Sequence, residues 1–542
     1  MQLIIFALDA STVPPSKSGA IIISPAELEW NDFTFRTRTE VRLSHPDRPG
    51  EPPLTLPAFF SFSGTEKEAD VRLLRKLLER APGGRLPADQ VPKFFTMLPD
   101  MLAYRKIVSF FGVGVAREML VTMNDVVAAD AGLPGTSSLR EAKKLPVFQQ
   151  AFLRQSESFF AWANAGPILR GLEYEEIGQI SSTFNIRFRL SGRPNEHDLT
   201  FRFDVKDHVL PRRFSIVIGK NGVGKSQTLA NIARAALRGT KALTDEHGKR
   251  PVLNRLLAFS PTVSSTLPSE RIRNPRIWYR RFAMTHSGGA RHGQTAAQLI
   301  VQLVRSTEGI RERKRLQLFL DAIGAIDDAH ELGLRSRNND GIIRFDELRP
   351  GTEQRRLETL GSIDERYEPV RVIDGRPYAL SSGEQSFVRF AAIASLHIEN
   401  GTLVLLDEPE THLHPNFISQ FVGVLDSVLE ATGSAAIIAT HSVYFVREAF
   451  EDQVIVLRSD LDRTIIAEPP KLKTFGADVG AISYFVFGED QPSRLAQKVE
   501  DLIAEGSASW AKTLETFKDD LSLELLGEIR ARIEPPAPMR RR

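Results

Sequence analysis

The sequence contains no cysteine, and this absence excludes several kinds of chemistry together. Disulfide bonds, thiolate zinc sites and a cysteine nucleophile all require that residue. Histidine is scarce as well, with 11 in 542 residues, and we find no histidine cluster of the kind that a metal-dependent nuclease uses. A chain without cysteine fits a reducing compartment, and we expect the protein to be cytoplasmic.

Long apolar runs are also missing. No stretch approaches the eighteen or more uninterrupted apolar residues that a membrane span needs. The apolar N-terminal run has no basic segment before it and is interrupted by Asp9, so we interpret it as a first strand. We therefore expect no membrane partner. The net charge of +2 is close to neutral for 542 residues, so a basic surface for nucleic acid would have to be local.

The length and the 42% hydrophobic content predict a globular chain of two to four domains. Local patterns divide it into five regions. They are an N-terminal accessory region at 1–175, β-rich and then helical; two lobes of a nucleotide-binding domain at 176–264 and 375–460; an Arg-rich, mostly helical insertion at 265–374; and a C-terminal extension at 461–542. The first region shows no chemistry, and we interpret it as a scaffold or interaction domain.

A glycine-rich loop lies between a β-branched run and a helical pattern, in FSIVIGKNGVGKSQTLANIA. Its segment 219–226 matches the phosphate-binding pattern G-x-x-x-x-G-K-S. Glycines let the backbone N–H groups approach phosphate oxygens, and the helix N-terminus adds partial positive charge. We expect Lys225 to reach the β- and γ-phosphates and Ser226 to bind Mg²⁺. The residues expected to bind the nucleotide here are Gly219, Asn221, Gly222, Gly224, Lys225, Ser226 and Gln227.

A second motif is the apolar run TLVLL followed by Asp407 and Glu408. A buried parallel strand is apolar throughout, and its carboxyl end opens onto the ligand crevice. Asp407 is therefore placed to hold Mg²⁺ together with Ser226, while Glu408 can orient and deprotonate the attacking water. The alternative is a pair of solvated acids at a strand end.

A third motif, LSSGEQS at 380–386, precedes an apolar helix. A serine hydroxyl, backbone N–H groups and the helix dipole can face one anion, so the string predicts a second phosphate cradle. Because the chain already has one phosphate loop, this cradle most economically serves the nucleotide of another copy. That reasoning predicts a head-to-tail homodimer with ATP between its subunits. Standing alone, the string would be an ordinary helix cap.

The order of these motifs, with DEPETHLHP and ATHS after them, resembles the nucleotide-binding domain of ABC ATPases. More narrowly, it resembles the SMC, RecF and overcoming-lysogenisation-defect families of AAA-type ATPases. The resemblance covers roughly 182–457. It implies an α/β fold, an ABC-type P-loop domain with a mixed sheet and a helical insertion, preceded here by an α+β region. It also implies ATP and Mg²⁺ as cofactors and hydrolysis of ATP to ADP and phosphate.

The resemblance assigns further roles. Ser381 and Gly383 would contact the γ-phosphate in trans, with Ser382 standing where many members have glycine. His441, in ATHS, would sense the γ-phosphate and act with Glu408 and Lys225 in catalysis, although a histidine at a strand end is otherwise often structural.

Two further positions belong to the segment that meets the partner subunit in this family, namely Glu410 and His412. The chain departs from transport-type domains, whose glutamine loop is replaced here by LLAFSPT. Ser260 would substitute there, or water would complete the metal shell. About two hundred residues precede the phosphate loop, whereas the family usually begins near it, so this region is an addition or it donates strands to the first lobe.

The families in this branch organise chromosomes, repair DNA or defend bacteria against phages. DLIAEGSAS in the C-terminal region lacks the acids of a Toprim nuclease, so we expect no nuclease in this chain and a separate effector, such as a nuclease, as partner. The predicted function is an ATPase that couples hydrolysis to DNA sensing or effector control in anti-phage defence. The alternatives are a DNA repair ATPase, an ATP-dependent clamp with slow turnover and, less favoured, a transporter subunit.

Duplex DNA is a possible ligand. The segment 271–281 interleaves arginines with Trp278 and Tyr279, as phosphate contact plus base stacking would require. The alternative is a helical surface on which arginine stems cover the aromatic rings.

Overall fold

The computed structural model forms two compact units, Met1–Ala477 and Asp478–Arg542. The residues that it describes are 3–13, 19–26, 35–48, 50–63, 70–132, 142–175, 180–204, 212–261, 266–270, 275–284, 294–306, 308–337, 341–348, 360–460, 462–487, 494–506, 509–518 and 520–534.

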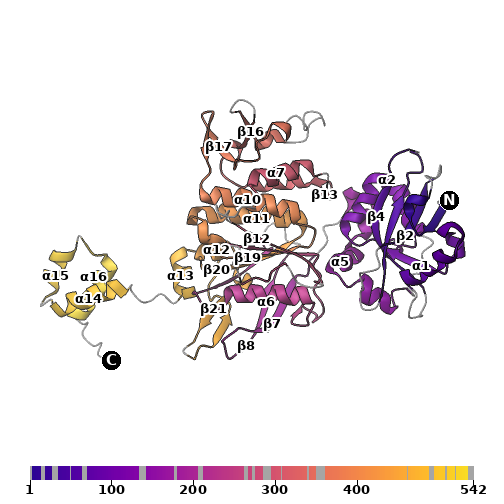
Figure 1. Ribbon diagram of the computed structural model, residues 1–542. Helices are drawn as coiled ribbons and strands as arrows, with labels where there is room; N and C mark the ends of the chain where they lie inside the picture. The colour runs from indigo at the N-terminus through magenta and orange to yellow at the C-terminus, as the bar shows by residue number, and fades with distance from the viewer. Residues whose placement is uncertain are drawn as a thin grey trace. The chain divides into compact units, whose positions relative to one another are not determined.

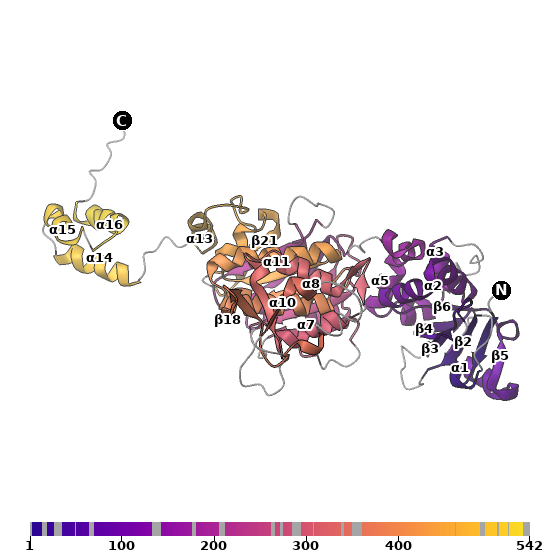
Figure 2. The same cartoon turned by 90° about the horizontal axis from the view of Figure 1, so that it is seen from above.

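The N-terminal region contains a six-stranded sheet of order β5-β1-β2-β3-β4-β6, in which only β1 and β2 pair in parallel. Its strands are β1 Leu3–Ala7, β2 Ala20–Pro25, β3 Arg38–Leu43, β4 Leu54–Phe62, β5 Arg85–Pro87 and β6 Phe94–Met97. Figure 2 shows them with α2 and α3 nearby. β5 and β6 come from the stretch expected to be helical, because their three or four residues are too short to show a period of two.

The helices of this region are α1 Val71–Arg80, α2 Met101–Thr122, α3 Val126–Asp130 and α5 Ser156–Asn164. Aspartates 70, 100 and 125 cap α1, α2 and α3 by accepting backbone N–H bonds. Within α2, Gly112 has φ 74°, which interrupts the helical geometry where glycine meets no steric penalty. The sheet and the helices share one apolar core rich in phenylalanine.

The central sheet of the ATPase region has the order β12-β11-β19-β20-β9-β21-β22 and is parallel except for β22. Its strands are β9 Phe214–Gly219, β11 Arg255–Ser260, β12 Trp278–Ala283, β19 Leu403–Asp407, β20 Ala435–Thr440, β21 Val454–Ser459 and β22 Ile465–Glu468. β9, β19 and β20 are buried along their whole length, which explains their continuous apolar runs.

Helices cover both faces of this sheet (Figure 1). α6 Lys225–Arg238 lies on one face, and α10 Ser382–His397, α11 Ile418–Thr432 and α12 Val443–Arg447 lie on the other. A small antiparallel sheet of order β10-β7-β8, formed by Leu243–Thr244, Thr183–Arg189 and Glu196–Arg202, packs with α6 in a second core. The fold class predicted from the motifs, an α/β P-loop domain of the ABC type, is confirmed.

The segment 265–374 is only partly helical, so that prediction needs correction. It holds α7 Ala296–Arg305 and α8 Arg315–Ile323, but also β12, β13 Gly309–Ile310, β14 Arg313–Lys314, β15 Leu332–Arg335, β16 Ile342–Arg344 and β17 Val370–Ile373. β15, β16 and β17 join β18 Arg376–Ala379 in a four-stranded sheet of order β16-β15-β17-β18. These strands are short and rich in arginine, so their alternation is weak.

The second unit consists of α13 Val479–Phe487, α14 Arg494–Gly506, α15 Trp510–Phe517 and α16 Leu523–Ile533. The described residues of the C-terminal extension thus form four helices after β22. β22, placed in the C-terminal extension by its sequence, belongs to the central sheet. In the described part of the chain, no helix is both long enough and apolar enough to cross a membrane.

Candidate nucleotide-binding site

The glycine-rich loop joins the end of β9 to the start of α6, as its sequence predicts. Gly222 and Gly224 have φ values of 82° and 100°, which other residues rarely adopt. A Cβ atom on Gly219 would lie 2.4 Å from the carbonyl oxygen of Leu457, and one on Gly224 would lie 2.7 Å from Leu190. The backbone conformation of the loop and its close packing therefore require these glycines.

Lys225 is the first residue of α6, and its side chain is buried. Its Nζ donates hydrogen bonds to the carbonyl oxygens of Gly219 at 2.9 Å and Lys220 at 3.3 Å. The ammonium group is thus held against the loop backbone. Burial lowers the pKa of Lys225, while the nearby acids oppose that shift.

The two predicted metal ligands are brought together. Ser226 Oγ donates to Asp407 Oδ1 at 2.8 Å, although the residues are 181 positions apart. Burial, reinforced by neighbouring carboxylates, raises the pKa of Asp407 to about 6. A hydroxyl and a carboxylate are oxygen ligands that suit Mg²⁺, and a bound cation favours the ionised carboxylate. The residues present therefore fit a magnesium nucleotide.

Glu408 follows β19 with a left-handed backbone, φ 45° and ψ 55°. Its N–H donates to the carbonyl of Ala439 on the neighbouring strand at 2.8 Å, which holds it in this conformation. Left-handed geometry is uncommon for a residue with a Cβ and often marks a functional position. The half-buried Glu408 lies at the same sheet edge as the loop.

His441 is held by Glu410. Nδ1 of His441 lies 3.0 Å from Glu410 Oε1, and the same oxygen accepts the His441 backbone N–H at 2.7 Å and the Thr440 hydroxyl at 2.6 Å. The hydrogen bond that the His441 imidazole donates to Glu410 raises the pKa of His441, which favours a charged imidazolium that can bind an anion. About half of the His441 side chain is exposed.

The carboxylate of Glu410 is buried and faces Thr440 and His441 of its own chain. The resemblance places Glu410 in a segment that meets the partner subunit, and that contact stays a prediction. The pairing within the chain follows from the sheet order, because β19 and β20 are neighbours and the residues after them meet at one edge. No periodicity in the sequence signals it.

The signature string caps α10. Ser381 Oγ accepts the N–H of Glu384 at 3.3 Å, and the Glu384 carboxylate accepts the N–H of Ser381 at 2.7 Å. The side chain and the backbone of Ser381 both form hydrogen bonds that lower the pKa of Glu384. Ser381 and Ser382 are exposed, and Gly383 is buried in the first turn. Within the described residues, no hydrogen bond joins 381–383 to the phosphate loop.

Arg371 lies beside the predicted cradle, and sequence reasoning does not single it out. From β17, its guanidinium donates to Glu384 at 3.0 and 2.6 Å and to Glu331 at 2.6 Å. Burial opposes ionisation of Glu384, but the bonds from Ser381 and Arg371 leave its pKa lowered. Arg371 thereby offsets a negative charge that stands at the mouth of a predicted phosphate cradle.

The remaining predicted residues line the loop. Asn221 is exposed, and Gln227 Oε1 accepts the N–H of Ser191 at 3.2 Å, which braces the β7–β8 turn. Arg193 of this turn, which carries no motif, donates to the Gly222 carbonyl at 2.9 Å. Ser260 is buried at the end of β11, at the sheet edge that carries Asp407.

The basic-aromatic segment is a strand rather than a helix. Its positions 271–274 lie outside the described residues, and Trp278 begins β12. Tyr279 is buried with its hydroxyl bonded to the Pro268 carbonyl at 2.8 Å. Arg255 and Arg280 lie over Trp278, at 4.7 and 5.5 Å from the ring. These contacts match the packed-aromatic alternative, and the buried Tyr279 ring cannot stack on a base.

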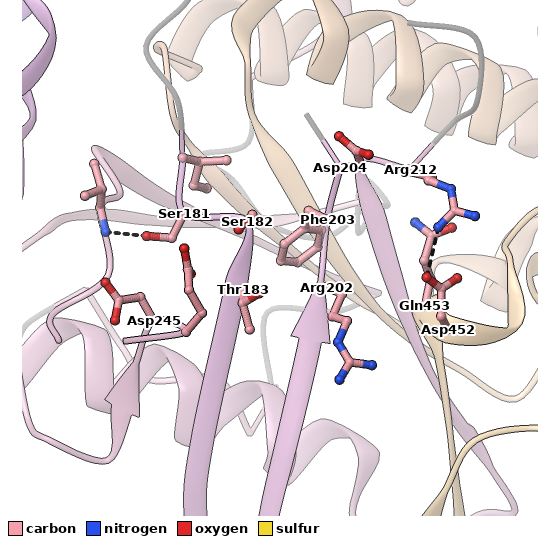
Figure 3. A pocket seen from close by; sticks show the side chains of 13 residues that line it. Ser181, Ser182, Thr183, Arg202, Phe203, Asp204, Arg212, Asp245, Asp452 and Gln453 are labelled. Carbon is pink, nitrogen blue, oxygen red and sulfur yellow. Dashed lines mark hydrogen bonds and ion pairs between the residues drawn. The ribbon is translucent and has the colours of Figure 1, made fainter. Parts of the chain in front are cut away.

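Figure 3 shows the residues that line a separate pocket of about 640 Å³. Because Arg212 and Gln453 are among them, the pocket lies near the start of β9, at the sheet edge opposite the phosphate loop. Its wall carries charges of both signs, from Arg202, Arg212, Asp245 and Asp452. Arg212 bonds Asp452 at 2.9 Å. A strand the length of β9 separates the two edges by roughly 16 Å, so this pocket is not the nucleotide site.

Comparisons with known proteins agree with this geometry. A family described as "AAA domain, putative AbiEii toxin, Type IV TA system" matches residues 305–447, which include the signature string, both acids and His441. The chain contains an ATPase domain of the AAA/ABC type.

Relatives of this ATPase differ in how much of the chain they cover. Protein ea59 of Escherichia phage lambda is 23% identical over 518 residues, 91% of each chain. The lipoprotein-releasing system ATP-binding protein LolD of Cereibacter sphaeroides is 39% identical over 97 residues, 18% of this chain and 39% of LolD. Among solved structures, cbiO1 of Clostridium perfringens, part of an ABC transporter complex, aligns with TM-score 0.30 and 14% identity, covering 59% of this chain and 95% of cbiO1.

Proposed function

We propose that the protein is an SMC/RecF-like ABC ATPase that closes as a homodimer around two ATP molecules. The observation that carries the proposal is that one phosphate cradle is paired with an acidic residue of its own chain, whereas the other is exposed to solvent. The loop at 219–226 is paired with Asp407 inside its own chain, whereas Ser381 and Ser382 are exposed at a capped helix N-terminus. A second subunit would supply the missing half of each site.

Gly383 supports the same arrangement. A Cβ atom there would meet Phe417 at 3.4 Å and Leu413 at 3.7 Å, which are ordinary contacts. The packing of the chain itself therefore does not require glycine at this position. A bare backbone in the first turn of α10 instead permits the close approach of an anion from outside.

Magnesium ATP supplies the phosphoanhydride bond that is cleaved. Lys225 and the loop N–H groups would bind its phosphates, and Ser226 and Asp407 would hold the metal. Glu408 orients the water and accepts its proton, and the His441 imidazolium donates a hydrogen bond to phosphate.

Complementation between variants tests the sandwich. Lys225→Ala inactivates the phosphate-loop half, and Ser381→Arg blocks the signature half. Each variant alone should be inactive, but random pairing in a mixture restores about a quarter of the wild-type sites. The matched control mixes Lys225→Ala with Glu408→Gln, which lie in the same half, so no site is restored. A mixture of the first pair that stays inactive, although both proteins fold, contradicts the proposal.

We further propose that hydrolysis controls DNA sensing or a separate effector in anti-phage defence. Two findings support this role: the matched family is described as a putative toxin of a toxin–antitoxin system, and a relative of similar length is encoded by a phage. The test is plating efficiency of phages on cells that express the wild type or Glu408→Gln. Equal plating on both strains contradicts the role.

Turnover with and without linear duplex DNA separates the two forms of control. A severalfold change that Glu408→Gln abolishes supports DNA sensing. If the rate of ATP turnover is the same with and without DNA, the result favours control of a protein effector, such as a separate nuclease.

A further inference from the structure

A buried ionic cluster lies where the N-terminal region meets the ATPase domain. Arg105 of α2 donates to Glu175 from Nη2 at 2.7 Å and from Nε at 3.0 Å, and its Nη1 donates to Glu399 at 2.8 Å. Arg315, the first residue of α8, binds the other oxygen of Glu399. None of the four residues is more than 4% exposed. Two positive and two negative charges therefore compensate one another away from water.

The cluster holds the C-terminal end of the signature helix α10, Ser382–His397. Glu399 follows Ile398, the C-cap of that helix, and Arg315 Nη1 donates to the carbonyl oxygens of Ser395 at 3.1 Å and Ile398 at 2.8 Å. Carbonyls at a helix C-terminus lack partners within the helix, so a guanidinium fixes both their position and their charge.

The next residues of the chain extend this connection. Asn400 Nδ2 donates to Glu175 at 3.1 Å, and Gly401, with φ 69°, packs against Phe160 of α5. A Cβ atom on Gly401 would lie 2.2 Å from the Phe160 ring, so this approach requires glycine. The turn after α10 is therefore enclosed by side chains of the N-terminal region.

The cluster resists partial opening. Burial opposes ionisation of Glu399, but Arg105 and Arg315 lower its pKa to about 2. Separating one partner would leave a charge buried and uncompensated, which proteins strongly disfavour. A helix of this length behaves as a rod of roughly 24 Å, so a displacement at its anchored end is transmitted to Ser381.

We propose that Arg105 and Glu175 are positioning residues for ATP turnover, through which the N-terminal region sets where the signature residues stand. The inference rests on the proposed sandwich and deepens it, because it assigns the N-terminal region a role in closing the dimer. Binding of a partner to the N-terminal region and closure over ATP then depend on each other.

The test compares Arg105→Gln with a matched control, Arg250→Gln. Arg250 also ties the N-terminal region to the ATPase domain, through Leu153 at 3.0 Å and Ser156 at 2.9 Å, but it does not touch α10. For each protein we would measure the melting temperature, the ATP dissociation constant, kcat and, in the Glu408→Gln background, ATP-dependent dimerisation.

Arg105→Gln should leave the ATP dissociation constant within about twofold, because the phosphate loop is intact, yet lower kcat by about tenfold or more, because a displaced cradle misplaces catalytic groups. It should also weaken dimerisation. Arg250→Gln should change none of these. If the wild type shows Glu408-dependent turnover and ATP-dependent dimers while the two variants behave alike, the inference is overturned and the proposed function stands. If the wild type shows neither property, both are overturned.

If Arg105→Gln does not fold, hydrogen exchange of the backbone amides tests the inference without changing the cluster. ATP is added to the Glu408→Gln protein, which keeps the cluster intact. Added protection in α2 near Arg105 and at 398–401, together with the first turn of α10, supports the inference. Protection confined to the phosphate loop and the first turn of α10 overturns it.

Discussion

The two halves of the proposed ATP site differ in how their side chains are held. In the phosphate-loop half, Lys225, Ser226 and His441 each have a partner within the chain. In the signature half, Ser381 and Ser382 are exposed. The backbone N–H of Ser381 donates to Glu384, which in turn is bound by Arg371. We call the phosphate-loop half the prepared half, because its side chains are already held by partners within one chain. We call the signature half the presented half, because its two serines are exposed on the surface of that chain. Changes in the two halves should therefore separate nucleotide binding from turnover.

The largest effect is expected from Lys225→Ala, which breaks the prepared half. Removing the ammonium leaves the phosphate charge uncompensated, so turnover should fall by about a hundredfold or more, with loss of ATP binding. Equilibrium ATP binding and phosphate release measure both. The control is Lys220→Ala, because Lys220 contributes only its carbonyl. A fall of less than tenfold would contradict this assignment.

Ser381→Ala breaks the presented half. ATP binding to the phosphate loop should be retained while turnover falls by about tenfold to a hundredfold, the value of a hydrogen bond to a charged group. Loss of the helix cap also destabilises the protein by about 1 kcal/mol. Ser522→Ala removes a similar cap from α16 and controls for that loss. Equal turnover in these two variants would show that Ser381 only caps its helix.

Glu410→Gln sharpens the comparison within the prepared half. Since Glu410 raises the pKa of His441, its neutral analogue should lower that pKa, so His441 loses its proton at a lower pH. We expect kcat to fall by about tenfold near pH 8 and less near pH 6. A pH profile of kcat checks this shift. An unchanged alkaline limb would mean that the charge of His441 does not contribute.

Arg371→Gln should have the smallest effect. Without the guanidinium, the charge of Glu384 is no longer offset beside the cradle, and kcat should fall by about threefold. The fall should shrink when Glu384 is also replaced by glutamine. Equal losses in the single and double variants would show that Arg371 acts on the fold of β17 and not on the cradle.

The sequence predicts best where a few consecutive residues determine both geometry and chemistry. The loop at 219–226 needs glycines for its own backbone, and Asp407 ends a strand of apolar residues. Both motifs can therefore be recognised in the sequence. Local sequence does not predict the contacts of Arg371, Arg193 and Arg105, because each of them binds residues far away in the chain. The partners Arg105 and Glu399 are 294 positions apart, and no local pattern encodes their meeting.

The strands missed by sequence reasoning show a second limit. β12 lies in the insertion predicted to be mostly helical, and its pairing with β11 at the sheet edge decides its structure. Similarly, no local pattern pairs Glu410 with Thr440 and His441, and the order of β19 and β20 brings these residues together. Tertiary pairing outweighs local preference in both places.

The left-handed backbone at Glu408 has a consequence for the evolution of this chain. A residue with a Cβ in that region is less stable there than glycine by about 1 kcal/mol. Selection for stability alone would favour glycine at 408, which would also remove the carboxylate. The chain thus gives up folding free energy at the position where its proposed reaction needs a general base.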